Sequence, residues 1–187
     1  MQKANNGIEL YYNHVPDQLC DKIIKFFEKD IKTPYVKKSY AYNGEGVSST
    51  DEDAIVKAQC WNRFIPEIDS ELYDLYSQAV IDYSSKYRLV ASLSDTPYKY
   101  KKYEVGGYFD WHTDTGLIGN TNVIQGMMYL NDDYEGGEVE WEHWGLIKPS
   151  KGLCIIAPSG FLFRHRCREI TRGDKYIITT FLTYKED

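Results

Sequence analysis

Two stretches of the chain repeat their hydrophobic residues at the spacing of an α-helix. Residues 15–30 have a proline near their start, and their apolar positions recur every three or four residues. These positions are Leu19, Ile23, Ile24 and Phe27. Residues 66–87 carry a longer pattern of the same kind, formed by Ile68, Leu72, Leu75, Ala79 and Tyr83. The spacing predicts two amphipathic helices that each bury one face.

After residue 95 the pattern changes to that of short β-strands. Segments rich in Tyr, Val, Ile and Thr alternate there with turns of Gly, Asn, Asp and Pro. We expect strands within residues 98–105, 108–114, 122–131, 137–142, 145–149, 153–158, 161–166 and 175–184. A further strand is expected within residues 7–13, before the first helix.

Short strands at this spacing are typical of a jelly roll. We therefore expect an α+β, mainly β fold: a double-stranded β-helix whose N-terminal helices pack on one sheet. The expected organisation is a single domain over residues 1–187, with a helical support in residues 1–95 and the jelly-roll core in residues 96–187.

The composition narrows the class of protein. With 187 residues, of which 42% are hydrophobic, the chain is long enough to bury a sizeable core. Its net charge of −6 argues against a general nucleic-acid binder, which needs a basic face. No stretch is apolar over a membrane-spanning length, and the start lacks the apolar run of a signal peptide.

The cysteines point to a reducing compartment. Cys20, Cys60, Cys154 and Cys167 are far apart in the sequence and form no CxxC pair. Reduced thiols in a cytoplasmic protein are the simplest interpretation, and a zinc knuckle is disfavoured. We expect a cytoplasmic monomer.

The segment "YFDWHTDTG" places His112 and Asp114 two residues apart within one expected strand. Side chains at that spacing on a strand point to the same side. An imidazole and a carboxylate so arranged are two of the three ligands of a 2-His-1-carboxylate iron site. An HxD pair alone is common by chance, and a pair on a strand surface is the alternative.

A third ligand would have to be one of the other histidines. His14 lies outside the β-rich region, and His143 lies at an acidic strand end, where we expect a solvated side chain. His165 lies late in the expected jelly roll and is flanked by strands. Lys175 follows ten residues later, at the start of the last strand.

The order H-x-D, then H-x9-K far along the chain, resembles the Fe(II)/2-oxoglutarate dioxygenases, in particular their prolyl 4-hydroxylase-like branch. The segments "YEVGGYFDWHTD", "MMYLND" and "YEGGEVEW" are similar to strands of that branch. "PSGFLFRHRCREITRGDKY" is similar to the bacterial and phage PKHD-type hydroxylases. The resemblance extends over residues 97–184. It departs from the family after the distal histidine, where residues 166–169 replace the usual valine or proline.

The resemblance implies the main site residues. His112, Asp114 and His165 would hold the iron, and Lys175 would pair with the far carboxylate of 2-oxoglutarate. Elementary electrostatics agrees with the last assignment, because a buried dianion needs a cation at the end that the metal does not hold.

The resemblance also implies a pocket around the cosubstrate. Tyr129 and Thr179 would hydrogen-bond the carboxylate that Lys175 holds, and Phe181 would form an aromatic wall. Gln125 shares strand parity with Tyr129 and is expected to point inward. Tyr103 matches a family tyrosine near the metal, on the substrate side, and is our candidate for a catalytic residue.

The charged runs have two interpretations. A local basic run is formed by Arg164, Arg166, Arg168 and Arg172, and Lys99, Lys101 and Lys102 could extend it. This run is either a solvated face or a rim that meets an acidic substrate. We expect a solvated acidic run on the other side of the core, at Asp132, Asp133, Glu135, Glu138, Glu140 and Glu142. Trp111 alternates away from the ligands and is expected in the core.

The activity implied by the resemblance is hydroxylation with Fe(II), 2-oxoglutarate and O2, ascorbate being a supporting reductant. The expected products are succinate and CO2, and the leading substrate is a peptidyl proline in a peptide or protein. The loop in residues 40–53 either closes over that peptide or is a plain surface loop. Alternative substrates are a small molecule or a nucleobase, and the lack of arginine after Lys175 on the last strand disfavours the nucleobase. A non-catalytic jelly-roll binding module is the third possibility, against which the intact triad and Lys175 argue.

Overall fold

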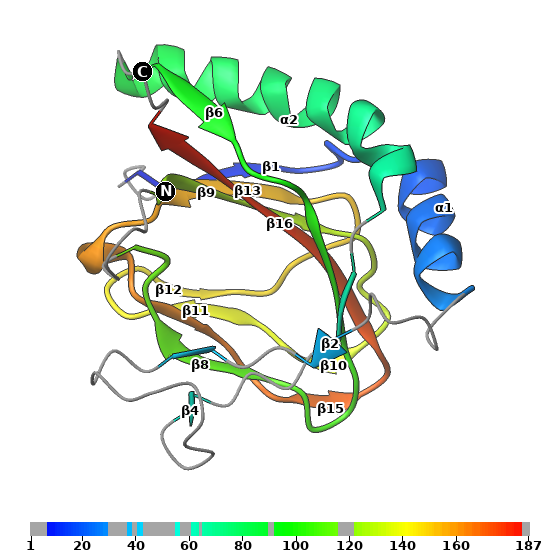
Figure 1. The fold of residues 1–187 in the computed structure, drawn as a ribbon. Coiled ribbons are helices and arrows are strands. Elements are labelled where there is room, and N and C mark those ends of the chain that lie inside the picture. The colour runs from blue at the N-terminus through cyan, green and yellow to red at the C-terminus, as the bar shows by residue number, and fades with distance from the viewer. Residues whose placement is uncertain are drawn as a thin grey trace.

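The computed structural model describes residues 7–29, 37–38, 41–42, 55–56, 61–63, 65–89, 92–115 and 122–184. In these parts two helices lie against one face of a large antiparallel sheet, and a smaller sheet lies against the opposite face (Figure 1). The arrangement is mainly β, with the helices on one sheet, as the sequence pattern predicts.

The large sheet joins strands from both ends of the chain. Its order is β1 (Glu9–Tyr11), β13 (Cys154–Pro158), β9 (Asn122–Tyr129), β16 (Lys175–Tyr184), β7 (Lys99–Tyr103), β5 (Trp61–Arg63) and β2 (Lys37–Lys38). A further strand, β6 (Leu93–Asp95), pairs with the C-terminal end of β16. The first part of the chain therefore contributes strands as well as helices.

The smaller sheet carries the two segments in which histidine ligands are expected. Its order is β12 (Gly145–Ile147), β11 (Val139–Trp141), β14 (His165–Cys167) and β8 (Phe109–His112). Two short ribbons complete the described strands: β10 (Glu135–Gly136) with β15 (Ile170–Arg172), and β3 (Ala41–Tyr42) with β4 (Ile55–Val56).

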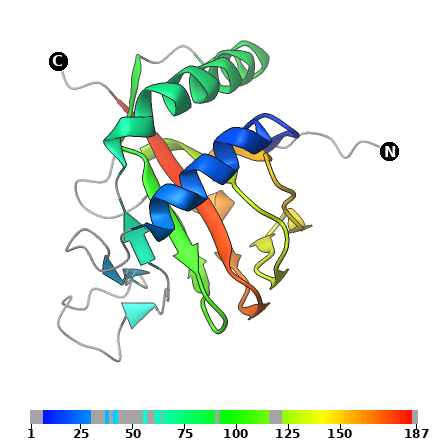
Figure 2. The same ribbon diagram turned by 90° about the vertical axis from the view of Figure 1, so that its right-hand side faces the viewer.

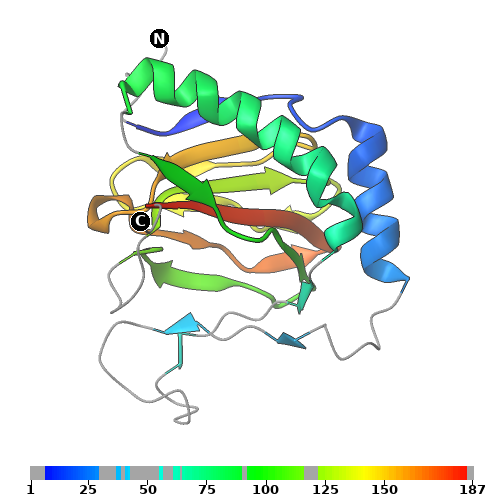
Figure 3. The ribbon, with the colours of Figure 1, turned by 45° about the horizontal axis from the view of Figure 1, so that its top comes forward.

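The helices form where the apolar periodicity predicts them. α1 (Asp17–Glu28) follows Pro16 and buries the apolar side that its spacing defines. α2 (Pro66–Tyr87) starts with proline in its first turn, where the missing N–H costs no hydrogen bond. The helix ends at Tyr87, because the next residue, Arg88, has a left-handed backbone conformation. Figure 2 shows α1 in front of β16, and Figure 3 shows α2 running across the strands of the large sheet.

Strand alternation divides the interior into two cores. On β16, Tyr176, Ile178 and Leu182 pack toward the helices, whereas Lys175 and Ile177 face the smaller sheet. The helix-side core is filled with aliphatic and tyrosine side chains. The core between the sheets also contains apolar residues, but it leaves space for a pocket. The large sheet thus separates a structural core from a candidate site.

The structure differs from the predicted elements in a few places. The segment Phe161–Phe163 is a short 3-10 helix, and the strand expected within residues 161–166 begins only at His165. The expected loop at 40–53 lies outside the described residues except for Ala41–Tyr42, which form β3. None of the described helices has the length and apolar character that a membrane crossing requires. Cys20, Cys154 and Cys167 are free thiols, and Cys60 lies outside the described residues.

Candidate metal centre and active site

The structure brings His112, Asp114 and His165 together between the two sheets. β8 and β14 are neighbours, and their register places His112 directly opposite His165. Asp114 follows two residues after the end of β8. One ligand atom from each residue lies within 4.8 Å of the others. His112 Nε2 is 3.6 Å from Asp114 Oδ1, and His165 Nε2 is 3.7 Å from Asp114 Oδ2. Two nitrogens and a carboxylate facing one point are the donor set of a non-haem iron site.

Backbone carbonyls orient both imidazole rings. His112 Nδ1 is 2.7 Å from the carbonyl oxygen of Asp110, and His165 Nδ1 is 3.1 Å from that of Phe163. A carbonyl oxygen can only accept, so each Nδ1 carries the proton and donates it. The lone pair then remains on Nε2, which is the nitrogen that faces Asp114. Such a hydrogen bond behind the ring is the usual support of a metal-binding histidine.

Aromatic packing fixes both rings, and burial keeps the ring of His112 uncharged. Phe109 stacks on His112 with ring centres 3.7 Å apart, and Trp141 lies 4.5 Å from the ring of His165. Burial lowers the pKa of His112 to about 3, with a further decrease from the neighbouring His165. His112 is therefore neutral at physiological pH, which is the form that binds a metal.

The triad opens into a pocket between the two sheets. Its other walls are the inward-facing side chains of β7, β9 and β16, including Tyr103, Tyr129 and Lys175. All the residues for which the resemblance implies a cosubstrate or substrate role line this pocket; they are Tyr103, Gln125, Tyr129, Lys175, Thr179 and Phe181.

Lys175 is the buried cation of the pocket. Its side chain is 1% exposed, and its Nζ donates to the carbonyl oxygen of Gly137 at 2.5 Å and contacts Cys167 Sγ at 3.1 Å. Three tyrosine rings lie within 5.2 to 5.8 Å of Nζ. No carboxylate of the described residues pairs with Lys175. A buried ammonium with uncharged neighbours leaves a strong site for an anion.

The backbone beside Lys175 requires glycine. Gly137 has φ +67°, a left-handed conformation that side chains rarely adopt. A Cβ atom there would lie 2.3 Å from Ile170 Cδ1 and 3.2 Å from Lys175 Cδ. The close approach lets the Gly137 carbonyl reach Nζ. The glycine pair of the "YEGGEVEW" segment therefore shapes the site.

Several polar groups in the pocket have no partner. Thr179 Oγ1 and Gln125 Oε1 are buried and make no hydrogen bond within the described part of the chain. Gln125 Nε2 donates to the Pro158 carbonyl oxygen at 3.0 Å, which fixes the direction of Oε1. The Tyr129 hydroxyl reaches only the weak acceptor Met127 Sδ, at 3.7 Å. Buried polar groups without partners are expected where a ligand supplies the partners.

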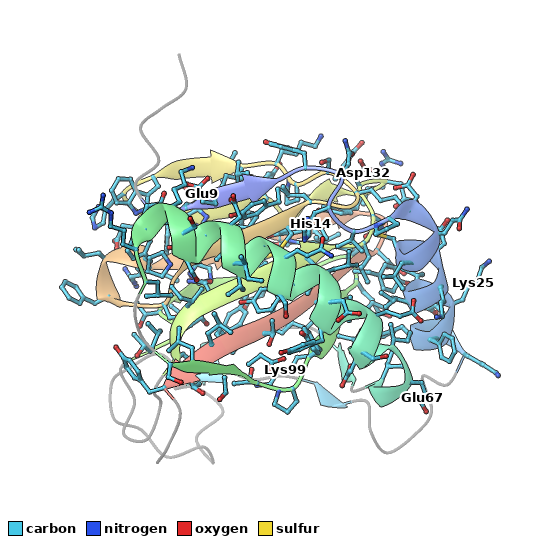
Figure 4. The ribbon with its side chains drawn as sticks, turned by 90° about the horizontal axis from the view of Figure 1, so that it is seen from above. Glu9, His14, Lys25, Glu67, Lys99 and Asp132 are labelled. Atoms are coloured by element: carbon cyan, nitrogen blue, oxygen red, sulfur yellow. The ribbon has the colours of Figure 1, made fainter. Side chains whose placement is uncertain are left out.

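The other two histidines lie away from the triad. His14 Nε2 is 2.8 Å from the carbonyl oxygen of Leu75, so this histidine joins the β1–α1 turn to α2 (Figure 4). His143 is exposed in the turn between β11 and β12. Neither belongs to a group of potential metal ligands among the described residues.

The prediction that the acidic run lies on the other side of the core and is merely solvated was wrong. β11 pairs with β14 in a register that puts Glu140 opposite Arg166. Glu140 Oε2 lies 2.7 Å from Arg166 and 2.9 Å from Arg168. Two further ion pairs are Arg164–Glu142 at 3.2 Å and Arg172–Glu135 at 2.7 Å. The basic run is therefore neutralised by neighbouring glutamates, which argues against its role as a rim for acidic substrates.

Two more expectations need correction. Trp111 is half-buried and not a core residue, because its ring lies under a guanidinium group, that of Arg166, at 4.8 Å. Lys102 does not belong to a surface rim. It is buried on the helix side of β7 and pairs with Glu28 and Asp174, both at 3.0 Å.

Sequence reasoning missed two residues that line the pocket. Cys167 lies two positions after His165 and contacts Lys175, and Lys101 lies two positions before Tyr103. Alternate residues of a strand face the same side, so the inward-facing positions of His165 and Tyr103 predict that Cys167 and Lys101 also face the pocket.

Comparison with known proteins shows which family and which folds this arrangement resembles. Residues 98–183 match the family model of the 2OG-Fe(II) oxygenase superfamily. Among curated proteins, no sequence matches the chain. The chain is similar in structure to a viral collagen prolyl hydroxylase from Paramecium Bursaria Chlorella virus-1, in complex with 2OG. The TM-score is 0.68 at 17% identity, over 97% of each chain.

Two further solved structures agree. A prolyl-4-hydroxylase from Pseudomonas putida has a TM-score of 0.71 at 13% identity, over 96% of this chain and 94% of that one. A prolyl hydroxylase from Trichoplax adhaerens, in complex with a hypoxia inducible factor peptide fragment, has a TM-score of 0.71 at 16% identity. That match covers 96% of this chain and 84% of the other. These likenesses confirm the predicted jelly-roll fold. The family match covers residues 98–183, which carry the triad and Lys175, and there the chain is similar to the 2OG-Fe(II) oxygenase superfamily. This similarity implies Fe(II), 2-oxoglutarate and O2 as cofactors and cosubstrates.

Proposed function

We propose that the protein is a prolyl 4-hydroxylase-like dioxygenase, which hydroxylates a peptidyl proline and releases succinate and CO2. One observation carries the proposal. The two free Nε2 atoms, the carboxylate of Asp114 and the buried ammonium of Lys175 line one pocket, so a metal and an anionic cosubstrate can be held side by side. The prolyl hydroxylases of the same fold support the choice of substrate.

His112, Asp114 and His165 would hold Fe(II). Their donor set fits a metal that must keep open positions, because three protein ligands occupy only one face of it. The carbonyls of Asp110 and Phe163 keep both imidazoles in the metal-binding tautomer. When bound, the iron with 2-oxoglutarate and O2 supplies the oxidising power that C–H hydroxylation requires.

Lys175 would bind the far carboxylate of 2-oxoglutarate. Its ammonium already has the desolvated setting in which a charge-assisted hydrogen bond is strong. Tyr129 and Thr179 would add hydroxyl donors, since neither has a strong partner in the described part of the chain. Phe181 would wall the pocket.

Gln125 and Tyr103 would act on the substrate side of the metal. Both side chains are buried and line the pocket. Gln125 Oε1 is an acceptor that an N–H donor can satisfy. Tyr103 would position substrate next to the iron, and its ring also packs near Lys175 Nζ, at 5.5 Å.

A peptide is the substrate that the comparisons favour. The Trichoplax adhaerens enzyme, whose fold covers 96% of this chain, was solved with a peptide fragment bound. The Chlorella virus enzyme is named for collagen, which is itself proline-rich. Recognition of a proline within a chain therefore suits this fold better than recognition of a free small molecule.

The test supplies Fe(II), 2-oxoglutarate and O2 together with a set of proline-containing peptides. The expected result is a mass gain of one oxygen atom on a peptide, with succinate released in equal amount. Release of succinate without an oxidised peptide would show the dioxygenase chemistry but contradict the peptidyl-proline substrate.

The metal assignment has its own test and a matched control. Without oxygen, Fe(II) and 2-oxoglutarate should give the wild-type protein a weak visible charge-transfer band. His165→Ala should abolish that band and succinate release, because the two remaining protein ligands do not hold the iron in the site. His143→Ala makes the same change at an exposed position and should keep both. The opposite result would overturn the choice of third ligand.

A further inference from the structure

Lys101 lines the pocket and Lys99 lies on the same face of β7, the strand that pairs with the strand of Lys175. β7 and β16 pair in a register that sets Lys101 opposite Ile177 and Lys99 opposite Thr179. Tyr103, Lys101 and Lys99 alternate onto the same face of β7, while Lys102 points the other way. Lys101 is half-buried in the pocket wall, and Lys99, two positions earlier on β7, is exposed to solvent.

The ammonium group of Lys101 lies close to the triad. Lys101 lines the same pocket, and its Nζ lies 5.4 Å from the ring of Phe109, which stacks on the imidazole of His112. Lys99 is within electrostatic reach of Asp114 and of Lys101. Partial burial and the like charge of Lys101 lower the pKa of Lys99.

Neither Lys99 nor Lys101 forms a salt bridge with a carboxylate in the part of the chain that the structure describes. Most other cations in the same part of the chain do have one: Lys22, Lys86, Lys102, Lys151, Arg164, Arg166, Arg168 and Arg172. Two neighbouring like charges in a partly desolvated site repel each other, which is unfavourable unless an anion joins them.

The cofactors leave these charges uncompensated. Fe(II) carries two positive charges, which 2-oxoglutarate matches, and the charges of Asp114 and Lys175 cancel. The loaded centre would therefore be neutral without Lys99 and Lys101. Because one cosubstrate carboxylate would bind the metal and the other Lys175, the remaining two ammonium groups are available to the substrate.

We propose that Lys99 and Lys101 select a peptide that carries a carboxylate side chain next to the proline to be hydroxylated. The proposal rests on the proposed function and adds the substrate class. A peptide is favoured over a small acid because Gln125 Oε1, buried in the same pocket, needs an N–H donor. The two lysines are two strand positions apart, about 7 Å, so one carboxylate can lie between their ammonium groups.

The first experiment measures binding without turnover. Fluorescein-labelled peptides are compared that are identical except for the residue beside proline, which is Asp, Asn or Lys. Their affinities for the protein with Fe(II) and 2-oxoglutarate are measured by anisotropy in the absence of oxygen. The Asp peptide should bind about tenfold more tightly than the Asn peptide at low salt, and the difference should shrink at high salt.

Variants then assign the preference to the lysines. Lys101→Met keeps the length of the side chain and should bring the Asp and Asn peptides close to equal affinity. Lys101→Glu should reverse the order, so that the Lys peptide binds best. Lys25→Met changes the net charge equally on α1, where the side chain points into solvent (Figure 4), and should keep the wild-type preference. The charge-transfer band checks that each variant keeps its metal site.

The outcomes separate this proposal from the proposed function. Equal affinity for the Asp and Asn peptides, no measurable binding of any of the three, or an unchanged preference in Lys101→Met would overturn the proposal. Selective binding of the Asp peptide without oxygen incorporation would leave charge selection standing and contradict proline hydroxylation. Hydroxylation of all three peptides with equal efficiency would support proline hydroxylation and contradict charge selection.

Discussion

At the scale of single residues, Lys175 shows how the setting of a side chain determines its chemistry. It is the most deeply buried cation described, and its hydrogen-bond partners are a carbonyl and a thiol. Such a lysine contributes little to stability, since the desolvation of a charge is costly without a counter-ion. Its value lies in the anion that it can bind.

Replacement of Lys175 by Met should therefore separate binding from folding. A charge-assisted hydrogen bond contributes roughly 1.5–3 kcal/mol, and its loss would also strand a buried carboxylate. Lys175→Met should raise the 2-oxoglutarate concentration for half-maximal succinate release on the order of 100-fold. The melting temperature of the cofactor-free protein should not fall, because an apolar side chain of similar volume replaces a buried charge.

Titration of succinate release against 2-oxoglutarate, at fixed Fe(II), measures the effect. Lys151→Met is the matched control, because that lysine pairs with Asp21 on the surface. A variant that needs no more 2-oxoglutarate than the wild type would mean that another cation holds the carboxylate. A large loss of stability would instead indicate a structural role for Lys175.

Individual residues were predictable from the sequence where a motif or strand parity applied. His112, Asp114 and His165 meet because two predicted strands are neighbours, and the H-x9-K spacing identified Lys175. The setting of Trp111 and the ion pairs of Glu140 were not predictable. They depend on which strands pair and in what register, and a single sequence does not carry that information.

At the scale of secondary structure, long periodic segments were easier to predict than short ones. The bounds of α2 agree with the predicted 66–87, because many apolar positions at helical spacing define it. Phe161–Phe163 was predicted as strand and is a 3-10 turn, since a short apolar run has no distinguishing period. Ile170–Arg172 was missed because its strand is short and ends at a glycine turn.

The contact between β9 and α2 depends on one glycine. Gly126 lies on the helix side of β9, and a Cβ atom there would be 2.3 Å from Tyr76 Cε2. Tyr76 is itself 1% exposed, so its ring has little room to move. Strand propensity would favour almost any other residue at this position, and the close approach of the ring explains the glycine.

Gly126→Ala should lower the free energy of unfolding by about 1–3 kcal/mol, the usual cost of overpacking a filled core. The measurement is urea unfolding of the wild type and the variant. Gly160→Ala serves as the control, because nothing lies within 4 Å of the added methyl group and the backbone φ is −67°. A Gly126→Ala variant as stable as the control would mean that α2 is not packed tightly on β9.

At the scale of the whole molecule, one face of the large sheet packs a structural core and the other face lines the candidate site. The helices cover one face and bury a continuous apolar core against it. The other face can then hold charged and polar groups in the pocket, because the fold does not depend on apolar packing there alone. Lys175 lies on this second face and the metal ligands face it from the smaller sheet, so that all of them line one pocket.

This placement should make the stability of the metal-free protein depend on pH through His112. The pKa of His112 is lowered from 6.5 to about 3 in the folded protein by burial and by His165. Below pH 6.5 the unfolded chain binds a proton that the folded protein does not bind. The contribution of this histidine is therefore complete above pH 6.5 and is lost as the pH falls from 6.5 toward 3.

The loss should reach at most about 1.4 kcal/mol per pH unit for this one group. Urea unfolding in the presence of a chelator, at several pH values between neutral and mildly acidic, measures it. His112→Gln keeps a polar side chain that does not titrate, and it should flatten the decrease in stability on acidification. His143→Gln makes the same substitution at an exposed position and should keep the wild-type slope. If His112→Gln loses stability with acid as steeply as the wild type, the proton uptake that drives acid unfolding does not occur at the imidazole of His112. The decrease would then have to come from groups elsewhere in the fold.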